Sequence, residues 1–158
     1  MEKTQFPADF KDFLKLLNEA QARYLVIGGW AVVKHGYPRY TGDFDIWIPM
    51  DPANSEIIRK VMLKFIRMAP TPDEMMTPKK IFRMGVVPNR LEVTNHIDGV
   101  EFETCYPARQ MLAFDGIVAP VIGMDDLIKN KLASARLKDL NDVQYLRKMR
   151  KKSRRGKK

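Results

Sequence analysis

The sequence contains only one cysteine, Cys105, so no disulfide can form within the chain. A chain of 158 residues buries enough apolar surface to fold without one, and scarce cysteine is typical of a reducing compartment. No apolar run approaches the roughly 20 residues of a membrane-spanning helix. The N-terminal residues also lack the apolar core of a secretory signal. We therefore expect a cytoplasmic protein with no contact with a membrane.

The sequence does carry a basic excess, and that excess is confined to one end. The formal net charge is +9, but residues 147–158 hold nine Lys and Arg and no acid, which leaves 19 basic and 19 acidic residues elsewhere. We therefore divide the chain into a neutral domain, residues 1–146, and a basic C-terminal tail, residues 147–158. The tail is either a solvated helix end that aids solubility or a contact for a nucleic acid or another acidic partner.

Apolar periodicity predicts helices and short strands that do not alternate strictly. Helices are expected from Pro7, over 30–35, from the cap Asp51, over 124–135 and over 138–150, and strands over 24–27, 43–48, 81–86, 90–97 and 117–122. These elements predict an α+β (α/β) fold, with a mixed β-sheet core flanked by helices.

Several local signals refine this prediction. Pro120 indicates that its strand lies at the edge of the sheet, and Asp98-Gly99 is a hairpin turn signal. The proline-rich stretch 70–80 is expected to be a loop. Leu127, Ile128 and Leu132 are expected to face inward from the helix over 124–135, and Leu140, Val143, Leu146 and Met149 are expected on one side of the last helix.

Two acids, Asp43 and Asp45, lie within a strand that is otherwise apolar. Side chains alternate along a strand, so both carboxylates point to one face while Phe44 and Ile46 point to the other. Like charges at this separation repel, and a divalent cation with oxygen ligands removes the repulsion. The alternative is an exposed sheet face on which both acids are solvated.

Two further features converge with this acid pair. Gly28-Gly29 follows a predicted strand, where glycines allow close backbone approach to an anionic ligand, although such a pair is often only a turn. Glu92 lies in another predicted strand between apolar neighbours. If the two acid-bearing strands pair, Glu92 completes a cluster of three carboxylates that can hold one or two Mg²⁺ ions. Taken alone, Glu92 is a surface acid.

The segment Ile27-Gly28-Gly29, followed after a short spacer by Asp43-Phe44-Asp45-Ile46, resembles the signature of the DNA polymerase beta-like nucleotidyltransferase superfamily. The longer stretch 28–48 is similar to small prokaryotic, minimal nucleotidyltransferases related to abortive-infection and toxin–antitoxin components. The segment 125–142 resembles the helical part that closes these proteins.

The resemblance implies roles for individual residues. Asp43 and Asp45 match the metal-binding, catalytic acids, and Glu92 matches the third, which can also activate the attacking hydroxyl. Gly28 and Gly29 match the loop that receives the triphosphate. The implied cofactor is Mg²⁺ or Mn²⁺, and the implied substrate is a nucleoside triphosphate.

Four more residues are candidate nucleotide contacts. Lys131 is expected by analogy to reach a phosphate. Arg39 and Thr41 either touch phosphate or brace the loop that precedes the acids. Trp30 is bulkier than the small residue usual at its position, and it either stacks on a base or packs in the core.

The leading functional prediction is a metal-dependent nucleotidyltransferase whose acceptor is an RNA, a protein side chain or a small molecule. A toxin partner or a second copy of the chain could complete the site. The alternative is a non-catalytic, antitoxin-like protein that uses the same fold to bind a partner. A third hypothesis, a basic nucleic-acid-binding protein, rests on the tail alone, because the rest of the chain is neutral.

Overall fold

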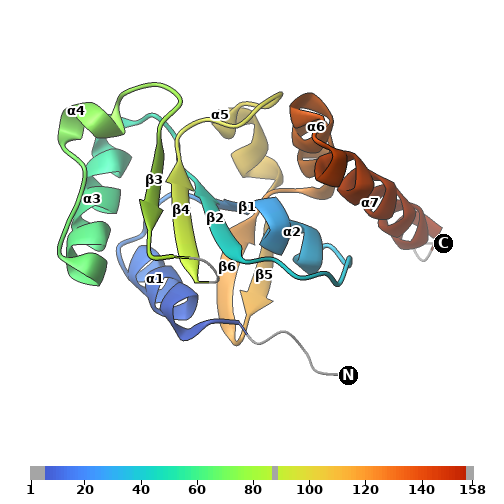
Figure 1. The fold of residues 1–158 in the computed structure, drawn as a ribbon, viewed down its shortest axis with the longest axis horizontal. Helices are drawn as coiled ribbons and strands as arrows, with labels where there is room; N and C mark the ends of the chain where they lie inside the picture. The colour runs from blue at the N-terminus through green and yellow to red at the C-terminus, as the bar shows by residue number, and fades with distance from the viewer. Residues whose placement is uncertain (1–5, 87–88, 156–158) are drawn as a thin grey trace.

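The computed structural model describes residues 6–86 and 89–155, and its centre is a six-stranded mixed sheet in the order β3-β4-β2-β1-β6-β5 (Figure 1). The strands are β1 (Leu25–Ile27), β2 (Asp43–Trp47), β3 (Ile81–Met84), β4 (Arg90–Thr94), β5 (Gln110–Phe114) and β6 (Ile117–Val121). Parallel pairing joins β2 to β4 and β1 to β6, whereas the other three neighbouring pairs are antiparallel. The predicted mixed sheet is therefore confirmed.

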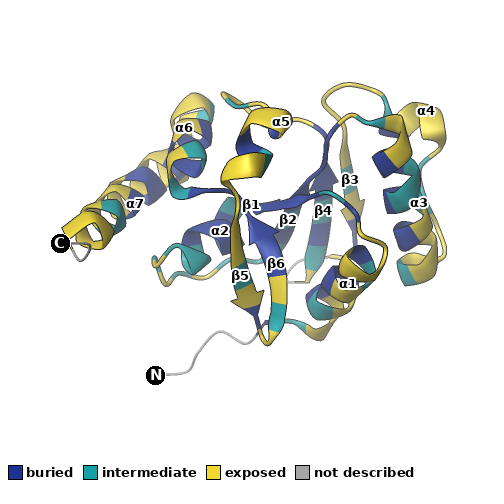
Figure 2. Ribbon diagram, turned by 180° about the vertical axis from the view of Figure 1, so that it is seen from behind, coloured by how far each residue is buried: buried dark blue, intermediate teal, exposed yellow. Residues whose placement is uncertain are grey.

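Helices surround this sheet. They are α1 (Ala8–Glu19), α2 (Gly28–Lys34), α3 (Pro52–Ile66), α4 (Pro72–Met75), α5 (Phe102–Cys105), α6 (Met124–Ser134) and α7 (Leu137–Arg155), with one 3₁₀ turn over Tyr106–Ala108. The predicted cap of α3 is present, because the Asp51 side chain accepts from the Ala53 N–H at 3.3 Å. Figure 2 shows buried residues concentrated on the sheet and on the helix faces turned toward it.

The apolar face of β2 packs against α1. Phe44 and Ile46 are fully buried, and the Phe44 ring lies 5.1 Å from the ring of Phe10 on α1. Phe6 and Phe114 add two more rings within 6 Å of Phe44. Because alternate residues of a strand face opposite ways, this packing turns Asp43 and Asp45 to the other face of the sheet.

The expected edge position of the strand around Pro120 is wrong, since β6 lies between β1 and β5. The pairing of β6 with β1 is short and centres on Val26 and Val121. The Ile122 N–H donates to the Val26 carbonyl of β1 at 3.0 Å. The Pro120 nitrogen, two residues earlier on the strand, also points toward β1, but at a level that lies before the first residue of β1. A missing N–H costs no ladder hydrogen bond there.

Three other local expectations are also corrected. Asp98-Gly99 forms a turn, but it leads into α5 rather than into a second strand of a hairpin. The stretch 70–80 contains the short helix α4, which a capping box of Thr71 and Glu74 begins. Strand β5 was not predicted, because it is an edge strand with mostly exposed side chains and no clear apolar alternation.

Four of the apolar residues expected on the inner faces of α6 and α7 are buried, namely Leu127, Ile128, Val143 and Leu146. Leu132 and Leu140 are each 40% exposed, so these two do not face inward. The buried positions also include charged residues, since Lys131 is 3% exposed and Asp139 is fully buried. An apolar pattern does not predict these charged positions.

The C-terminal helix α7 runs without a break from Leu137 to Arg155, so the basic segment is helical as far as the described residues extend. Beyond residue 146, its side chains are exposed or half-buried, and the helix leads away from the sheet (Figure 1). Within the described ranges, no helix combines the length and apolar character that crossing a membrane requires.

Removing the ring of Phe44, on the apolar face of β2, tests this packing. Phe44→Ala is expected to lower the free energy of unfolding by about 3–5 kcal/mol, because the side chain is fully buried. Tyr40→Ala, a change at a residue that is 67% exposed, is the control and should cost less than about 0.5 kcal/mol. Urea denaturation of both variants measures the difference, and equal losses would contradict the assigned core.

Candidate active site

Asp43, Asp45 and Glu92 meet on one face of the sheet. Strand β2 pairs in parallel with β4 in a register that places Asp45 beside Glu92 and Asp43 beside Arg90. The buried neighbours Phe44 and Leu91 point to the opposite face. The pairing of the two acid-bearing strands, which the sequence left conditional, is therefore present.

Two arginines pair with these acids. Arg90 Nη2 lies 3.0 Å from Asp43 Oδ2 and 3.3 Å from Glu92 Oε1. Arg83, which faces Glu92 from β3, places its Nε 3.0 Å from the same Oε1 atom. The guanidinium groups thus offset part of the like-charge repulsion among the carboxylates.

Asp45 is the acid whose titration the site changes most. Burial and the neighbouring carboxyls of Glu92 and Asp43 together raise its pKa to about 7, while the charge of Lys131 acts in the opposite direction. Below this pH, Asp45 therefore holds a proton in the folded protein.

Gly28 and Gly29 bring the backbone of α2 close to these residues. Gly28 has a φ of +67°, and a Cβ atom there would collide with the Asp45 carboxylate. A Cβ at Gly29 would collide with Thr41 Oγ1. Both positions therefore need glycine, Gly28 for its backbone conformation and both for the close approach.

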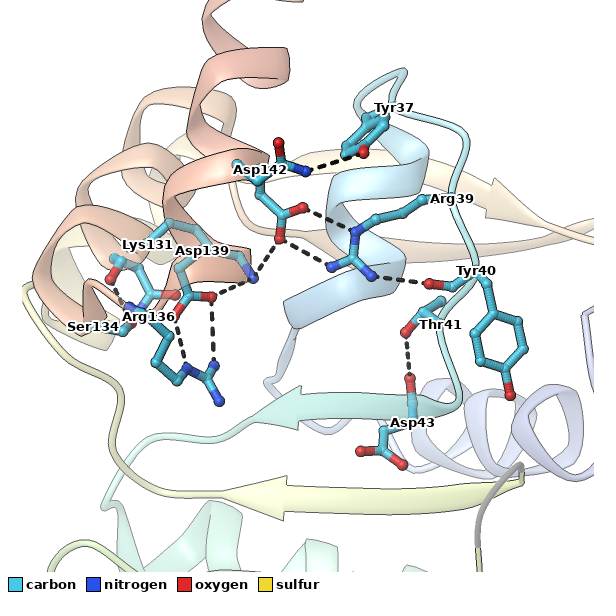
Figure 3. A network of polar contacts seen from close by, with 12 residues as sticks. Tyr37, Arg39, Tyr40, Thr41, Asp43, Lys131, Ser134, Arg136, Asp139 and Asp142 are labelled. Carbon is cyan, nitrogen blue, oxygen red and sulfur yellow. Dashed lines mark hydrogen bonds and ion pairs between the residues drawn. The ribbon is translucent and has the colours of Figure 1, made fainter.

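A chain of buried ion pairs joins α6, α7 and the loop before β2 (Figure 3). Lys131 Nζ lies 3.2 Å from both Asp139 Oδ1 and Asp142 Oδ2, and all three residues are at most 3% exposed. Arg39 binds both oxygens of Asp142, at 2.9 and 3.0 Å. Arg136 Nε binds Asp139 at 2.8 Å. Burial opposes ionisation of Asp139, but the Arg136 hydrogen bond and the Lys131 charge lower its pKa overall.

The loop before the acids is held by the same chain of contacts. Arg39 Nη1 donates to the Tyr40 carbonyl at 2.9 Å, and the Thr41 hydroxyl donates to the Asp43 carbonyl at 3.3 Å. These are the contacts expected if Arg39 and Thr41 brace the loop. Their contact with a nucleotide stays a prediction.

Trp30 lies among core aromatics. It is 6% exposed, and its ring centre lies 5.0 Å from that of Phe6 and 6.4 Å from that of Phe114. This position matches the packing alternative more closely than stacking on a base.

The three acids line an open cavity of about 660 Å³. Of the predicted site residues, the cavity wall includes Asp43, Asp45, Glu92, Gly28 and Lys131. It does not include Gly29, Trp30, Arg39 or Thr41, which lie behind it. The wall also contains residues without a predicted role, namely Arg83, Arg90, Thr94, His96, Asn130 and Arg136.

A sequence signal for some of these residues was available. Arg90 is two positions before Glu92, so strand alternation puts both on one face. Arg136 and Asp139 are three residues apart, the spacing of neighbours on a helix. The partners of Lys131 had no such signal, because they depend on how α7 packs against α6.

The donor set fits a hard divalent cation. All three acids offer oxygen ligands, the type that Mg²⁺ prefers, and the buried Asp43 Oδ1 atom has no hydrogen-bond partner in the described part of the chain. With the arginines bound as they are, no three His, Cys, Asp or Glu side chains of residues 6–86 and 89–155 stand close enough together to hold a metal. Cation binding therefore requires loss of the proton on Asp45 and rearrangement of the arginine pairs.

Comparison with solved structures identifies the fold. The chain is similar to TM1012 from Thermotoga maritima, a nucleotidyltransferase candidate, with a TM-score of 0.55 and 15% identity over 90% of this chain and 91% of that one. It is also similar to the lincosamide antibiotic adenylyltransferase LnuA in its lincomycin-bound form, with a TM-score of 0.54 and 15% identity over 92% and 98%.

A third similar structure is an antigenic nucleotidyltransferase-like protein from Paracoccidioides brasiliensis, with a TM-score of 0.53 and 16% identity over 89% of this chain and 74% of that one. No family model and no curated protein matches the sequence. The chain therefore has the nucleotidyltransferase fold, as the sequence predicted.

The raised pKa of Asp45 makes the stability of the metal-free protein depend on pH. Between the ordinary value of 3.8 and about 7, the folded state holds a proton that the unfolded state releases. The free energy of unfolding contributed by this group therefore falls as pH rises through that window. Asp45→Asn removes this titration, so the variant should gain stability relative to the wild type as pH rises. Urea denaturation in the presence of a chelator measures this, and a pH-independent difference would contradict the assignment.

The buried ion pairs predict a large loss when their central cation is removed. Lys131→Met leaves Asp139 and Asp142 buried with one partner each and should lower the free energy of unfolding by about 3 kcal/mol. Lys129→Met changes an exposed lysine of the same helix and should cost less than about 0.5 kcal/mol. Thermal denaturation compares the two variants, and similar losses would argue against the network.

Proposed function

We propose that the chain transfers a nucleoside monophosphate from a nucleoside triphosphate to an acceptor, with Mg²⁺ or Mn²⁺ held by Asp43, Asp45 and Glu92. The observation that carries this proposal is the strand register that sets Asp45 beside Glu92 on the acid-bearing face. The cavity in front of these acids, about 660 Å³, has the size of a site for a nucleotide-sized ligand. The shared fold with an adenylyltransferase supports the same reaction class.

The reaction is a displacement at the α-phosphorus. An acceptor hydroxyl oxygen forms a bond to this phosphorus while the bond to the pyrophosphate oxygen breaks, and pyrophosphate leaves with the electron pair. The hydroxyl proton passes to a carboxylate, for which Glu92 is the candidate. Asp43, Asp45 and Glu92 would hold a divalent cation, which when bound would neutralise charge on the phosphate oxygens.

The remaining residues of the wall bind and orient the substrate. Arg83 and Arg90 present guanidinium groups that can pair with phosphate oxygens. Gly28 allows the triphosphate to approach the backbone next to Asp45. The contacts of Arg39 and Thr41 hold the loop that leads into β2, so that Asp43 and Asp45 are fixed before substrate arrives.

One observation favours the second function, a non-catalytic protein of the antitoxin type. Arg83 and Arg90 pair with the carboxylates of Glu92 and Asp43, which is also how a fold that has lost catalysis would keep these acids. Transfer activity distinguishes the two functions. A partner-binding protein of this kind would make no nucleotide product with or without the acids.

Removing either acid of β2 tests the transferase directly. Asp43→Asn and Asp45→Asn are expected to lower the rate of nucleotide transfer by at least about 1000-fold, because each removes an anionic ligand of the proposed divalent cation. The unfolding midpoint should remain close to that of the wild type or rise. The measurement is release of pyrophosphate with each ribonucleoside triphosphate and Mg²⁺.

Asp12→Asn, at an exposed acid of α1, is the matched control and should retain full activity. Wild-type rates in either site variant would exclude these acids as the reacting centre.

A further inference from the structure

A second cavity adjoins the proposed nucleotide site. It has a volume of about 380 Å³ and lies where β2 and β4 end, next to α5. Lys79, His96 and Ile97 line both cavities, so the two are direct neighbours. Nothing in the proposed nucleotide transfer assigns an occupant to this second cavity.

Strand geometry aligns the second cavity with the acids. Asp43, Asp45 and Trp47 alternate along β2, so all three belong to one face of the sheet. The first two line the larger cavity and Trp47 lines the smaller one. On β4, Glu92 and Thr94 share this face by the same alternation, and His96 follows two residues after the end of the strand. A molecule in the smaller cavity thus lies along the sheet face that carries the acids.

The wall of the second cavity is largely apolar. Its apolar residues are Trp47, Pro49, Met50, Pro78, Ile97, Val100 and Phe102. Trp47 and Phe102 form its aromatic part, with ring centres 5.2 Å apart and nearly perpendicular planes. A volume near 400 Å³ with apolar walls and a few polar groups is typical of a site for a small organic molecule.

The same wall does not suit a nucleic-acid strand. The charged residues of the wall are mixed in sign, with Glu101 and Glu103 beside Lys79. A groove that follows a phosphate backbone carries positive charge along its length.

From this arrangement we infer that the cavity between Trp47, Val100 and Phe102 binds the acceptor, and that the acceptor is a small organic molecule with an apolar body and a hydroxyl group. The inference rests on the proposed function. The apolar body fills the smaller cavity, and the hydroxyl group points along the sheet face toward Asp45 and Glu92. This assignment selects one of the three acceptor classes that the sequence leaves open.

Blocking the cavity tests the inference. Val100→Trp places a large side chain in the cavity from its half-buried loop, and Met50→Trp does so from a different residue of the wall, in case the first variant folds poorly. Val118→Trp, at a residue that is 51% exposed on β6, is the matched control. Each protein receives Mg²⁺, a nucleoside triphosphate labelled at the α-phosphate, and one of three acceptor fractions of a cell lysate: small molecules, RNA or protein.

The expected result is label in the small-molecule fraction alone, with a loss of at least tenfold in a folded blocking variant and none in Val118→Trp. The stabilisation of the protein by Mg²⁺ and nucleoside triphosphate should be the same in all variants, since the nucleotide site is unchanged. Label in RNA or protein, or small-molecule labelling that the blocking variants leave intact, would overturn the acceptor assignment and keep the transferase. Failure to label any fraction would contradict the proposed function itself.

Discussion

The carboxylates of Asp43, Asp45 and Glu92 share one face of the sheet and repel one another, and the charged residues around them offset this repulsion. The register of β2 and β4 brings Asp45 and Glu92 together, and Asp43 is two residues away on the same face. Without compensation, this cluster would destabilise the sheet. The protein offsets the charge with Arg83 and Arg90 at the open side of the cluster, and Asp45 keeps a proton that an exposed aspartate would lose. A site held in this way needs no cation to fold, and cation binding requires that Asp45 lose its proton and that the arginine pairs rearrange.

The need to pair buried charges also accounts for the ion pairs between α6 and α7. Lys131 faces the cavity from α6, where its charge favours ionisation of Asp45. A buried lysine needs partners, and Asp139 and Asp142 of α7 supply them. Asp142 also binds Arg39 of the loop before β2. Through these contacts, the position of α7 is linked to that of the acids, although the helix contributes only Asp139 to the cavity wall.

The sequence predicted those parts of the protein that depend on local patterns. Alternation along β2, the glycine pair after β1 and the cap of α3 are local signals, and the structure contains each of them. The strand order could not be predicted, and Pro120 was misleading, because its strand has an internal place with only a short pairing to β1. On α6 and α7 the apolar pattern correctly predicted the burial of Leu127, Ile128, Val143 and Leu146, but it also predicted inward positions for Leu132 and Leu140, which are exposed, and it gave no signal for the buried charges of Lys131 and Asp139. For the site, the three acids followed from spacing and resemblance, whereas the arginines that pair with them and the second cavity required the tertiary structure.

The most direct test of the proposed transferase site is whether Asp43, Asp45 and Glu92 bind a divalent cation together with a nucleotide. Thermal denaturation with Mg²⁺ and each ribonucleoside triphosphate, in the wild type and in the Asp43→Ala/Asp45→Ala variant, measures this. At a ligand concentration of 100 times the dissociation constant, binding adds about 2.7 kcal/mol to stability. For a domain of this size, the unfolding temperature should rise by roughly 5 to 10 °C. We expect such a rise for at least one nucleotide, and we expect it to depend on Mg²⁺ and to be absent from the variant. No rise with any nucleotide, or an equal rise in the variant, would contradict the proposed site.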